Sequence, residues 1–430
     1  MLVRAIAIAV VSLALLAGPA PAADPLRDEQ WGLEMVKAPA AWPTSTGVGA
    51  VVAVIDTGVQ RNHPDLGGRL VTGYDFVGDD PIESGDEDDD PTDGNGHGTH
   101  VSGIVAATRD NGEGIAGVAP GARVLPLRVL DDEGAGYADD TIKAIEMAVD
   151  RGVHVINLSL GDFLPLQSTL FNDPEYAEVL ERAVGAGIVV VIAAGNNGLP
   201  KCENPNVEGI LCVGSVDSRG QRSVFSSFGS NVDLMAPGGS GAGGSSEDVL
   251  STWVNSRYES VSGTSQSAPH VAGVAALLAS LGVRGAEATG RIVATAAATG
   301  SSFQYGAGIV DAQAAVAGLG GPGSAPDPDD PAGRWSTKSP VKRRAVRRRG
   351  FRVVCESVRP GVCRVVVRHR GRRIARGRVD VPAGTATRAT ATLNRRGRRI
   401  LKRMGRRIRV RVVVTLPGER AGGRRVVVRR

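Results

Sequence analysis

A serine, a histidine and an aspartate in this sequence have side-chain types that together can break an acyl bond. Ser265 lies in the stretch Gly263-Thr-Ser-Gln-Ser267, directly before an apolar, alanine-rich run. A hydroxyl is a weak nucleophile until an imidazole takes its proton. A buried carboxylate can fix the tautomer of that imidazole and stabilise the imidazolium. We predict that His97 supplies the imidazole and Asp56 the carboxylate.

Each of these residues also has a plainer structural explanation. A serine in front of a helix commonly caps it, and an aspartate after a strand can do the same for the helix that follows. His97 and His100 are spaced i, i+3, which also suits a metal site or a core histidine, although no third ligand stands at a matching spacing. The catalytic interpretation therefore needs a fold that brings the three side chains together.

Apolar segments alternate along the chain in a strand–helix rhythm that predicts such a fold. The predicted strands are 51–55, 123–129, 153–160, 188–194, 211–216 and 232–235. The predicted helices are a small-residue helix around His100, then 137–150, 176–186, 267–281, 285–297 and 311–317. This order predicts an α/β domain with a doubly wound, mostly parallel sheet. Residues 24–46 are interpreted as an irregular arm that wraps around it.

The carboxyl edge of such a sheet is where sites form. Asp56 ends the strand 51–55, and Asn196 follows the strand 188–194. An asparagine amide at that edge can donate a hydrogen bond to a developing oxyanion. The chain order Asp, His, Ser differs from the Ser, Asp, His order of an α/β-hydrolase. The stretch around Ser265 also lacks the second glycine of Gly-x-Ser-x-Gly.

Five segments resemble, in the same order, motifs of the subtilisin-like serine endopeptidases (subtilases, peptidase family S8). They are Val54-Ile-Asp-Thr-Gly58, His97-Gly-Thr-His-Val101, Asn157-Leu-Ser-Leu-Gly161, Ala193-Ala-Gly-Asn196 and Gly263-Thr-Ser-Gln-Ser-Ala-Pro-His270. The resemblance extends over roughly residues 25–318. It implies a subtilisin-like fold and a serine endopeptidase that acts on proteins or peptides without a catalytic cofactor.

The resemblance also implies a role for each matching catalytic residue. Asp56 would orient the imidazole, His97 would act as general base and then as general acid, and Ser265 would attack to form an acyl-enzyme. Asn196 would donate to the oxyanion beside the backbone N–H of Ser265.

Further matching residues are implied to bind the substrate. Ser159, Leu160 and Gly161 would form the strand that pairs with the substrate backbone, and Gly195 would line the primary specificity pocket. Gln266 stands where many relatives have methionine, so no thioether would lie beside the nucleophile.

A structural calcium site is implied at Asp65, together with the oxygen-rich loop Thr108–Ile115. This loop is one residue longer than the family pattern. The acidic run Asp79–Asp93 does not match an EF-hand loop, and it is interpreted as a solvated, mobile surface loop with weak cation binding at most.

The N-terminal segment predicts export. Met1–Ala22 has a basic residue, an apolar run and a small-residue cleavage site, as in a signal peptide, and no later stretch is apolar for long enough to span a bilayer. The segment leads almost directly into the peptidase-like region, which leaves no room for the folding propeptide that many secreted subtilases carry. We therefore expect a secreted protein, either extracellular or associated with the cell envelope.

Four cysteines stand in two close pairs, Cys202 with Cys212 and Cys355 with Cys363. Export and close spacing favour these two short-loop disulfides, although four cysteines allow three connectivities.

Charge divides the chain into two parts. Residues 334–430 hold 33 Lys and Arg against 3 Asp and Glu, a net charge of +30, whereas the rest of the chain has a net charge of −25. Arginine alternates with Val or Ile in 351–355, 363–368, 376–381, 385–393 and 408–416, which predicts a small antiparallel β-sandwich with a cationic outer face. Such a face suits anionic cell-surface polymers, nucleic acid or the acidic first part of the chain.

Four segments result. We predict a signal peptide at 1–22, a subtilisin-like peptidase domain at 23–318, a Gly/Pro/Asp-rich linker at 319–338 and a basic, β-sandwich-like domain at 339–430. The competing interpretation is an inactive or envelope-tethered binding protein whose basic domain holds anionic polymers. The sequence carries no signal for the oligomeric state.

Overall fold

The computed structural model describes most of the chain. The described residues are 23–77, 87–160, 174–202, 207–243, 245–319, 335–336, 341–342, 346, 351–355, 361–369, 372–381, 387–403, 407–415 and 422–429. The predicted signal peptide and most of the predicted linker lie outside these residues, so the four segment boundaries stay predictions. No helix among the described residues is long and apolar enough to cross a membrane.

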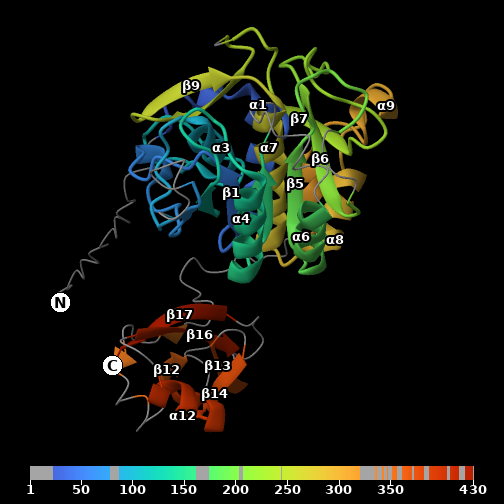
Figure 1. The fold of residues 1–430 in the computed structure, drawn as a ribbon. Coiled ribbons are helices and arrows are strands. Elements are labelled where there is room, and N and C mark those ends of the chain that lie inside the picture. Colours follow the sequence, from blue (N-terminus) through green and yellow to red (C-terminus); the bar gives the residue numbers. More distant parts are fainter. Residues whose placement is uncertain are drawn as a thin grey trace, which may run out of the picture.

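A seven-stranded parallel sheet forms the centre of the larger unit (Figure 1). Its strands are β1 (Val51–Asp56), β2 (Tyr74–Asp75), β3 (Arg123–Arg128), β4 (Val155–Leu158), β5 (Val189–Ala193), β6 (Ile210–Val216) and β7 (Leu234–Pro237). They lie in the order β2-β3-β1-β4-β5-β6-β7, and every pairing is parallel. The predicted α/β fold with a mostly parallel sheet is thus confirmed.

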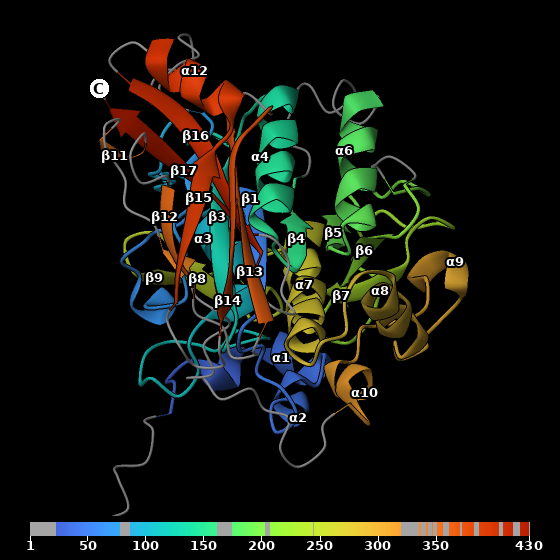
Figure 2. The same ribbon diagram turned by 90° about the horizontal axis from the view of Figure 1, so that it is seen from below.

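Apolar side chains alternate between the two faces of this sheet, and helices cover both. Val52 and Val54 of β1 face a core shared with α3 (His97–Ala106) and α7 (Thr264–Ser280). Ala53 and Ile55 face the opposite core, shared with α4 (Ala138–Arg151) and α6 (Pro174–Gly185). Figure 2 shows α4 and α6 side by side, with the strands between them and α7. The result is three layers, and β1 is buried on both faces.

The two flanking strands of β1 show why a site forms at its end. The chain passes from β1 through α3 to β3 on one side, and then through α4 to β4 on the other side. Crossovers that leave in opposite directions open a crevice at the carboxyl ends of the strands. Asp56 is the last residue of β1 and therefore stands at this point.

The N-terminal arm differs from the prediction, because it contains helical turns. They are η1 (Arg27–Glu29), α1 (Trp31–Met35) and α2 (Ala38–Ala41). Segments this short do not show a helical period in the sequence. The indole of Trp42 donates to the carbonyl of Val118 at 3.0 Å and fastens the arm to the core. Three further short helices are η2 (Pro64–Leu66), α9 (Ser302–Tyr305) and α10 (Ala312–Val316), and α8 spans Gly285–Ala294.

An antiparallel hairpin, β8 (Val249–Trp253) and β9 (Arg257–Val261), was not expected from the sequence. Its turn uses two residues of positive φ, Asn255 and Ser256. The hairpin lies on α3, where the Thr252 hydroxyl donates to the Thr99 carbonyl at 2.7 Å. It leads directly into α7 and so delivers the start of that helix to the carboxyl edge of the sheet.

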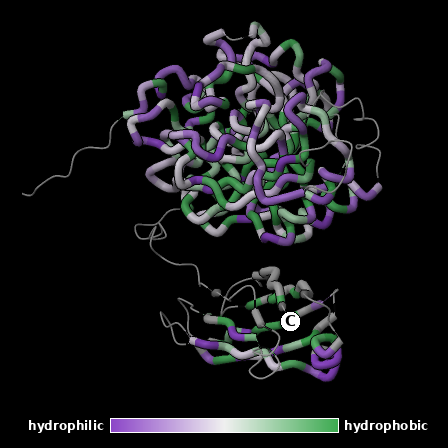
Figure 3. The backbone as a smooth tube through the Cα atoms, turned by 60° about the vertical axis from the view of Figure 1, so that its left-hand side comes forward, coloured by the Kyte–Doolittle hydropathy of each residue, from purple (hydrophilic) through white to green (hydrophobic). Residues whose placement is uncertain are grey.

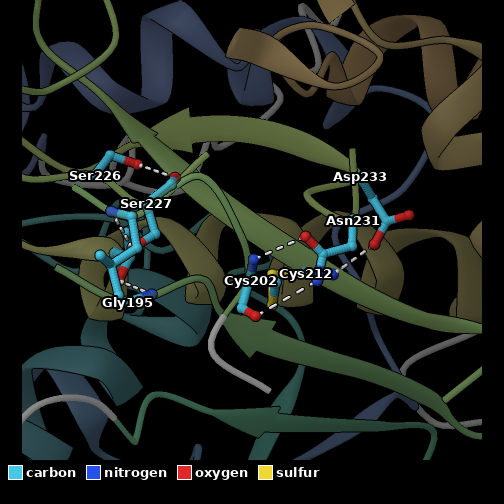
Figure 4. The surroundings of a disulfide bond; sticks show 9 residues. Gly195, Cys202, Cys212, Ser226, Ser227, Asn231 and Asp233 are labelled. Atoms are coloured by element: carbon cyan, nitrogen blue, oxygen red, sulfur yellow. Dashed lines mark hydrogen bonds between the residues drawn. A yellow bond between two sulfur atoms is a disulfide. The ribbon is translucent and has the colours of Figure 1, made fainter. Parts of the chain in front are cut away.

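Both predicted cysteine pairs form disulfides in the structure. Cys202 and Cys212 join the loop after β5 to β6, and Asn231 bonds to both backbone groups of Cys202 (Figure 4). At the start of the same loop, the Ser227 N–H donates to the Gly195 carbonyl at 2.9 Å. The segment that carries Asn196 is therefore fixed at both ends.

The C-terminal unit, meaning the described residues from Trp335 to Arg429, is an all-β structure with one helix. Its strands are β10 (Trp335–Ser336), β11 (Val341–Lys342), β12 (Phe351–Cys355), β13 (Gly361–His369), β14 (Arg372–Val381), β15 (Thr387–Leu393), β16 (Arg407–Thr415) and β17 (Gly422–Arg429). They form one continuous sheet, antiparallel except between β11 and β17. Because side chains of β12, β13 and β16 share one core, the sheet curls around it.

The arginine–valine alternation places valine in the core and arginine on the outer face of the sheet, as predicted. In β13, Val365 and Val367 are buried, whereas Arg364 is exposed. The helix α12 (Arg395–Arg403) was not predicted, and it places Leu401 in the core. Figure 3 shows that hydrophobic residues gather in the interior of the larger unit and that the helix of the C-terminal unit is hydrophilic.

Candidate active site

The carboxylate of Asp56 and the imidazole of His97 form a hydrogen-bonded pair. Nδ1 of His97 lies 2.7 Å from Oδ1 of Asp56. The Asp56 side chain is completely buried, and that of His97 is 14% exposed. The backbone N–H of Thr57 also donates to Oδ1 of Asp56, at 2.8 Å. The carboxylate thus fixes one ring nitrogen of His97.

Two glycines permit this close approach of β1 and α3. Gly98 lies in the first turn of α3, and a methyl group on it would come within 2.2 Å of the Gly58 carbonyl oxygen and 3.2 Å of Cβ of Asp56. Gly58 itself has φ +111°, a region that other residues rarely adopt. The glycines in the motifs around Asp56 and His97 are therefore required by packing.

The environment raises the pKa of His97 above its ordinary value. Burial by itself lowers this pKa, because it disfavours the imidazolium. The charge and hydrogen bond of Asp56 and the charge of Asp93 act in the opposite direction and outweigh burial. The site therefore favours the protonated imidazole that forms when His97 takes a proton.

Ser265 is the second residue of α7 and is held at the carboxyl edge of the sheet. The N–H of Gly263 donates to the carbonyl of Gly238, which directly follows β7. The Ser265 hydroxyl donates to the Ser159 carbonyl at 3.2 Å, and the Ser159 hydroxyl donates to the Ser265 carbonyl at 2.8 Å. Pro269 explains the second bond, because it lacks the N–H that would otherwise occupy the Ser265 carbonyl within the helix.

The two halves of the site lie at the same edge of neighbouring strands. Ile55 of β1 is paired with Leu158 of β4, so Asp56 and Ser159 follow at the same level, about 4.8 Å apart across the sheet. The Asp56–His97 pair is at one of these strand ends, and the Ser265 hydroxyl is bonded at the other. The structure thus gathers the predicted acid, base and nucleophile at one edge.

The amide of Asn196 is oriented for donation. Its Oδ1 accepts from the N–H and the hydroxyl of Thr264 at 2.8 and 3.0 Å, which turns Nδ2 away from Thr264. A methyl group placed on Gly263 would lie 3.6 Å from Nδ2 of Asn196 and 3.7 Å from the backbone nitrogen of Ser265. Two donors thus border the same small space at the N-terminus of α7, where the helix dipole also favours negative charge.

The predicted substrate-binding residues are only partly described. Ser159 and Leu160 are buried, and Ser159 uses both its hydroxyl and its carbonyl towards Ser265. The N–H of Gly195 donates to the Thr264 hydroxyl at 3.1 Å, next to Asn196. Gly161 lies outside the described residues. The assignment of these residues to substrate binding stays a prediction.

His100 is a core histidine. Its Nε2 lies 3.1 Å from the carbonyl oxygens of both Val249 and Glu259, which holds the hairpin on α3. Burial lowers its pKa to about 3, so it is neutral at ordinary pH. The described part of the chain contains no group of three or more His, Cys, Asp or Glu that could hold a metal ion.

Asp65 lies away from the catalytic edge, in a separate buried acidic pocket. Its carboxylate accepts from the Asn111 side chain at 2.9 Å and from the Ile115 N–H at 2.8 Å. Asp24, also buried, accepts from the N–H groups of Asp110 and Asn111. Burial raises the pKa of Asp65 to about 6, and the charge of Asp24 adds to this.

Comparison with known proteins decides the family. A family model described as the subtilase family matches residues 47–308. The chain belongs to the subtilase family. This subtilase is 42% identical to thermitase from Thermoactinomyces vulgaris over 289 residues, which make up 67% of the chain and 95% of thermitase.

Two further comparisons agree. The subtilase is 44% identical to a thermophilic serine proteinase from Bacillus sp. (strain AK1) over 282 residues, which make up 64% of the chain and 65% of that relative. A solved protease structure from Pseudoalteromonas arctica PAMC 21717 matches with a TM-score of 0.62 and 35% identity, over 70% of this chain and all of that one. The enzyme class is that of a serine-type endopeptidase.

Sequence reasoning missed three residues that support this subtilase's sites. Thr264 orients Asn196, and Asp24 joins Asp65, but a threonine before the nucleophile and an aspartate in an arm carry little signal by themselves. Asp93 was assigned to a solvated acidic loop, yet it is only 6% exposed. Residues 87–90 of that run are exposed as predicted, and residues 79–86 lie outside the described part of the chain.

The raised pKa of His97 predicts the pH profile of this subtilase. A general base must be neutral, so kcat/KM should fall as the pH drops through a value above about 6.5, the ordinary pKa of histidine. Asp56→Asn removes the charge that raises this pKa, so the acidic limb should move to lower pH. The variant should also lose about 10⁴-fold in kcat because the wrong tautomer is favoured. Asp139→Asn, an exposed residue of α4, is the control, and an unmoved limb in Asp56→Asn would contradict the assignment.

Proposed function

We propose that this subtilase is a secreted serine endopeptidase that cleaves peptide bonds through Asp56, His97 and Ser265. The observation that carries the proposal is the 2.7 Å Asp56–His97 hydrogen bond at the same sheet edge that holds the Ser265 hydroxyl. The predicted signal peptide Met1–Ala22 and the Cys202–Cys212 disulfide support export, because disulfides persist in oxidising compartments.

The reaction begins when the Ser265 hydroxyl turns from the Ser159 carbonyl towards Nε2 of His97. Its oxygen attacks the peptide carbonyl carbon while its proton passes to His97, and the carbonyl π electrons move to the oxygen. The imidazolium that results is stabilised by Asp56, which keeps its negative charge. The Ser265 N–H and Nδ2 of Asn196 donate to the oxyanion and require little rearrangement to do so.

Collapse of this intermediate completes the first half of the reaction. The carbonyl reforms, the C–N bond breaks, and His97 gives its proton to the leaving amine, which leaves the acyl group on Ser265. A water molecule then loses a proton to His97 and attacks the ester. The Ser265 oxygen leaves with that proton, which regenerates the enzyme. Ser159, Leu160 and Gly161 would pair with the peptide backbone during these steps, as in β-strand addition.

Ser265→Ala tests the proposed nucleophile. We expect loss of about 10⁶-fold in kcat on a casein substrate, the magnitude established for a subtilisin, with the melting temperature preserved. A phosphonofluoridate should label Ser265 in the wild type and leave the variant unlabelled. Absence of labelling in folded wild type would instead favour an inactive binding protein.

We also propose that the buried acidic pocket binds a structural Ca²⁺ ion. The donor set fits a hard cation, because Asp65 and Asp24 are buried carboxylates that form no ion pair among the described residues. Both carboxylates accept hydrogen bonds from Asn111, and carbonyl oxygens of the loop 108–115 would complete the shell. A bound Ca²⁺ would neutralise the two carboxylates and hold the arm to the loop 108–115.

Calcium should raise the melting temperature, and more at pH 7.5 than at pH 5. Folding raises the pKa of Asp65 to about 6, so between about pH 4 and pH 6 the folded state holds a proton that the unfolded state has lost. The free energy of unfolding therefore falls as the pH rises over this range. Ca²⁺ counters that loss where Asp65 is ionised. Measured by calorimetry in a Ser265→Ala background, which avoids autolysis, the Ca²⁺ effect should vanish in Asp65→Asn and persist in Asp139→Asn. A Ca²⁺ effect that survives Asp65→Asn would contradict the site.

For the C-terminal unit we propose binding to an anionic, phosphate-bearing polymer of the cell surface. On α12, Arg395, Arg396, Arg399 and Lys402 are exposed, while Leu401 on the other side is buried. Among the described residues of this unit the only acidic one is Asp380, so within that part the basic residues far outnumber the acidic ones. Export favours a surface polymer over nucleic acid. The scarcity of aromatic residues in 334–430 also disfavours stacking on single strands.

Two variants of equal charge test the α12 surface. One replaces Arg395, Arg396, Arg399 and Lys402 with Gln; the control replaces Arg364, Arg376, Arg378 and Arg388, which are exposed arginines of the sheet. Binding to immobilised poly(glycerol phosphate) should weaken at least tenfold in the α12 variant, and the slope of log K against log salt should fall by about 3. Equal losses in both variants would contradict a specific α12 surface, and tighter binding to duplex DNA would make nucleic acid the partner.

A further inference from the structure

A second buried carboxylate lies behind the Asp56–His97 pair. Oδ1 of Asp93 accepts hydrogen bonds from the Thr57 hydroxyl at 2.9 Å and from the N–H groups of Asn95 and Gly96 at 3.1 and 2.8 Å. Oδ2 accepts from the N–H and the hydroxyl of Thr99 at 2.9 and 2.5 Å. Five hydrogen bonds thus end on one side chain that is only 6% exposed.

These contacts join the two segments that carry the catalytic pair. Thr57 follows Asp56 at the end of β1, and its hydroxyl both donates to Asp93 and accepts from the Gly98 N–H at 2.9 Å. Gly98 follows His97 in the first turn of α3. The Thr57 hydroxyl thus joins the residue after the acid to the residue after the base. Asp93 accepts the hydrogen bond that this hydroxyl donates, and it also accepts from Thr99 of α3.

The same carboxylate sets the start of α3. The first N–H groups of a helix have no partner within the helix. Here the N–H of His97 bonds to the Asn95 side chain, that of Gly98 to Thr57 and that of Thr99 to Asp93. The position at which α3 begins, and with it the direction of the His97 side chain, depends on this arrangement.

We propose that Asp93 is a positioning residue of the active site, which holds Asp56 and His97 in their mutual geometry through Thr57 and the first turn of α3. This inference rests on the proposed catalytic roles of Asp56 and His97. Asp93 itself touches neither the substrate nor the reacting atoms. Because a misplacement of about 1 Å can cost about 10²-fold in rate, a residue that fixes this geometry should act on kcat more than on KM.

The electrostatic surroundings of His97 give the proposal a second readout. The charge of Asp93 raises the pKa of His97 together with that of Asp56. Other titratable groups close to α3 include His100 on the helix and His270 on α7, and burial lowers their pKa values to about 3 and about 4. At η2, burial also lowers the pKa of His63, and Asp65, a residue of η2 itself, belongs to the calcium pocket. Of the two carboxylates that act on His97, Asp56 is hydrogen-bonded to the ring, and Asp93 acts on the pKa through its charge.

Asp93→Asn in the full chain tests this role. We expect kcat per titrated active site to fall about 10- to 100-fold with KM changed less than about threefold. The acidic limb of kcat/KM should move to lower pH, because the charge that Asp93 contributes to the raised pKa of His97 is lost. Asp90→Asn, three residues earlier and with its side chain 54% exposed, is the matched control and should leave both quantities unchanged.

A purely structural role would lower the melting temperature only. The proposal would therefore be overturned if Asp93→Asn, labelled by a phosphonofluoridate to the same extent as the wild type, had the wild-type kcat and an unmoved acidic limb. If Asp93→Asn does not fold, Thr57→Val tests the same link, because it removes the hydroxyl that joins Asp93 to β1, and it should lower kcat. Thr57→Ser keeps the hydroxyl and should recover most of the loss. Equal activity of the two Thr57 variants would overturn the proposal. Failure of the triad assignment would appear separately, as activity that survives Ser265→Ala.

Discussion

The hydrogen bond between a fully buried carboxylate and a nearly buried imidazole is the constraint on which this active site depends. An ionised carboxylate removed from water is costly unless charge and hydrogen bonds compensate it, and loss of one partner of such a pair typically costs about 3–5 kcal/mol. Asp56 offsets part of this cost through His97 and the Thr57 N–H, which both contact Oδ1, at the end of a strand that is covered on both faces. The parallel sheet, the glycines and the packing of α3 all serve to keep that pair dry and close.

Much of this arrangement could be predicted from the sequence. Buried strands of a parallel sheet read as short continuous apolar runs, so β1, β5 and β6 were placed correctly. The motifs that follow those strands then predicted which polar residues would reach the carboxyl edge. Asp56 and His97 are the clearest case, because they are 41 residues apart in the chain and hydrogen-bonded in the fold.

The remainder depends on tertiary contacts that leave little local pattern. The hairpin β8–β9 carries serine, threonine and tryptophan that look like loop residues, and it is a hairpin because it lies on α3. The arm 24–46 forms helical turns because the core covers it, not because of its own periodicity. Asp93 shows the same limit most clearly. At the end of an acidic run it looks solvated, and only the fold shows that five donors converge on it.

Pro269 has a mechanical consequence for Ser265. A helix normally ties each carbonyl of its first turn to an N–H one turn later, so motion of the helix body is passed to its beginning. At Ser265 that tie is absent, and the carbonyl is bonded instead to Ser159 at the end of β4. The backbone of Ser265 is thus anchored to the end of a central strand, in place of one of the hydrogen bonds to its own helix. Motion of α7 against the core is then passed less directly to the Ser265 hydroxyl.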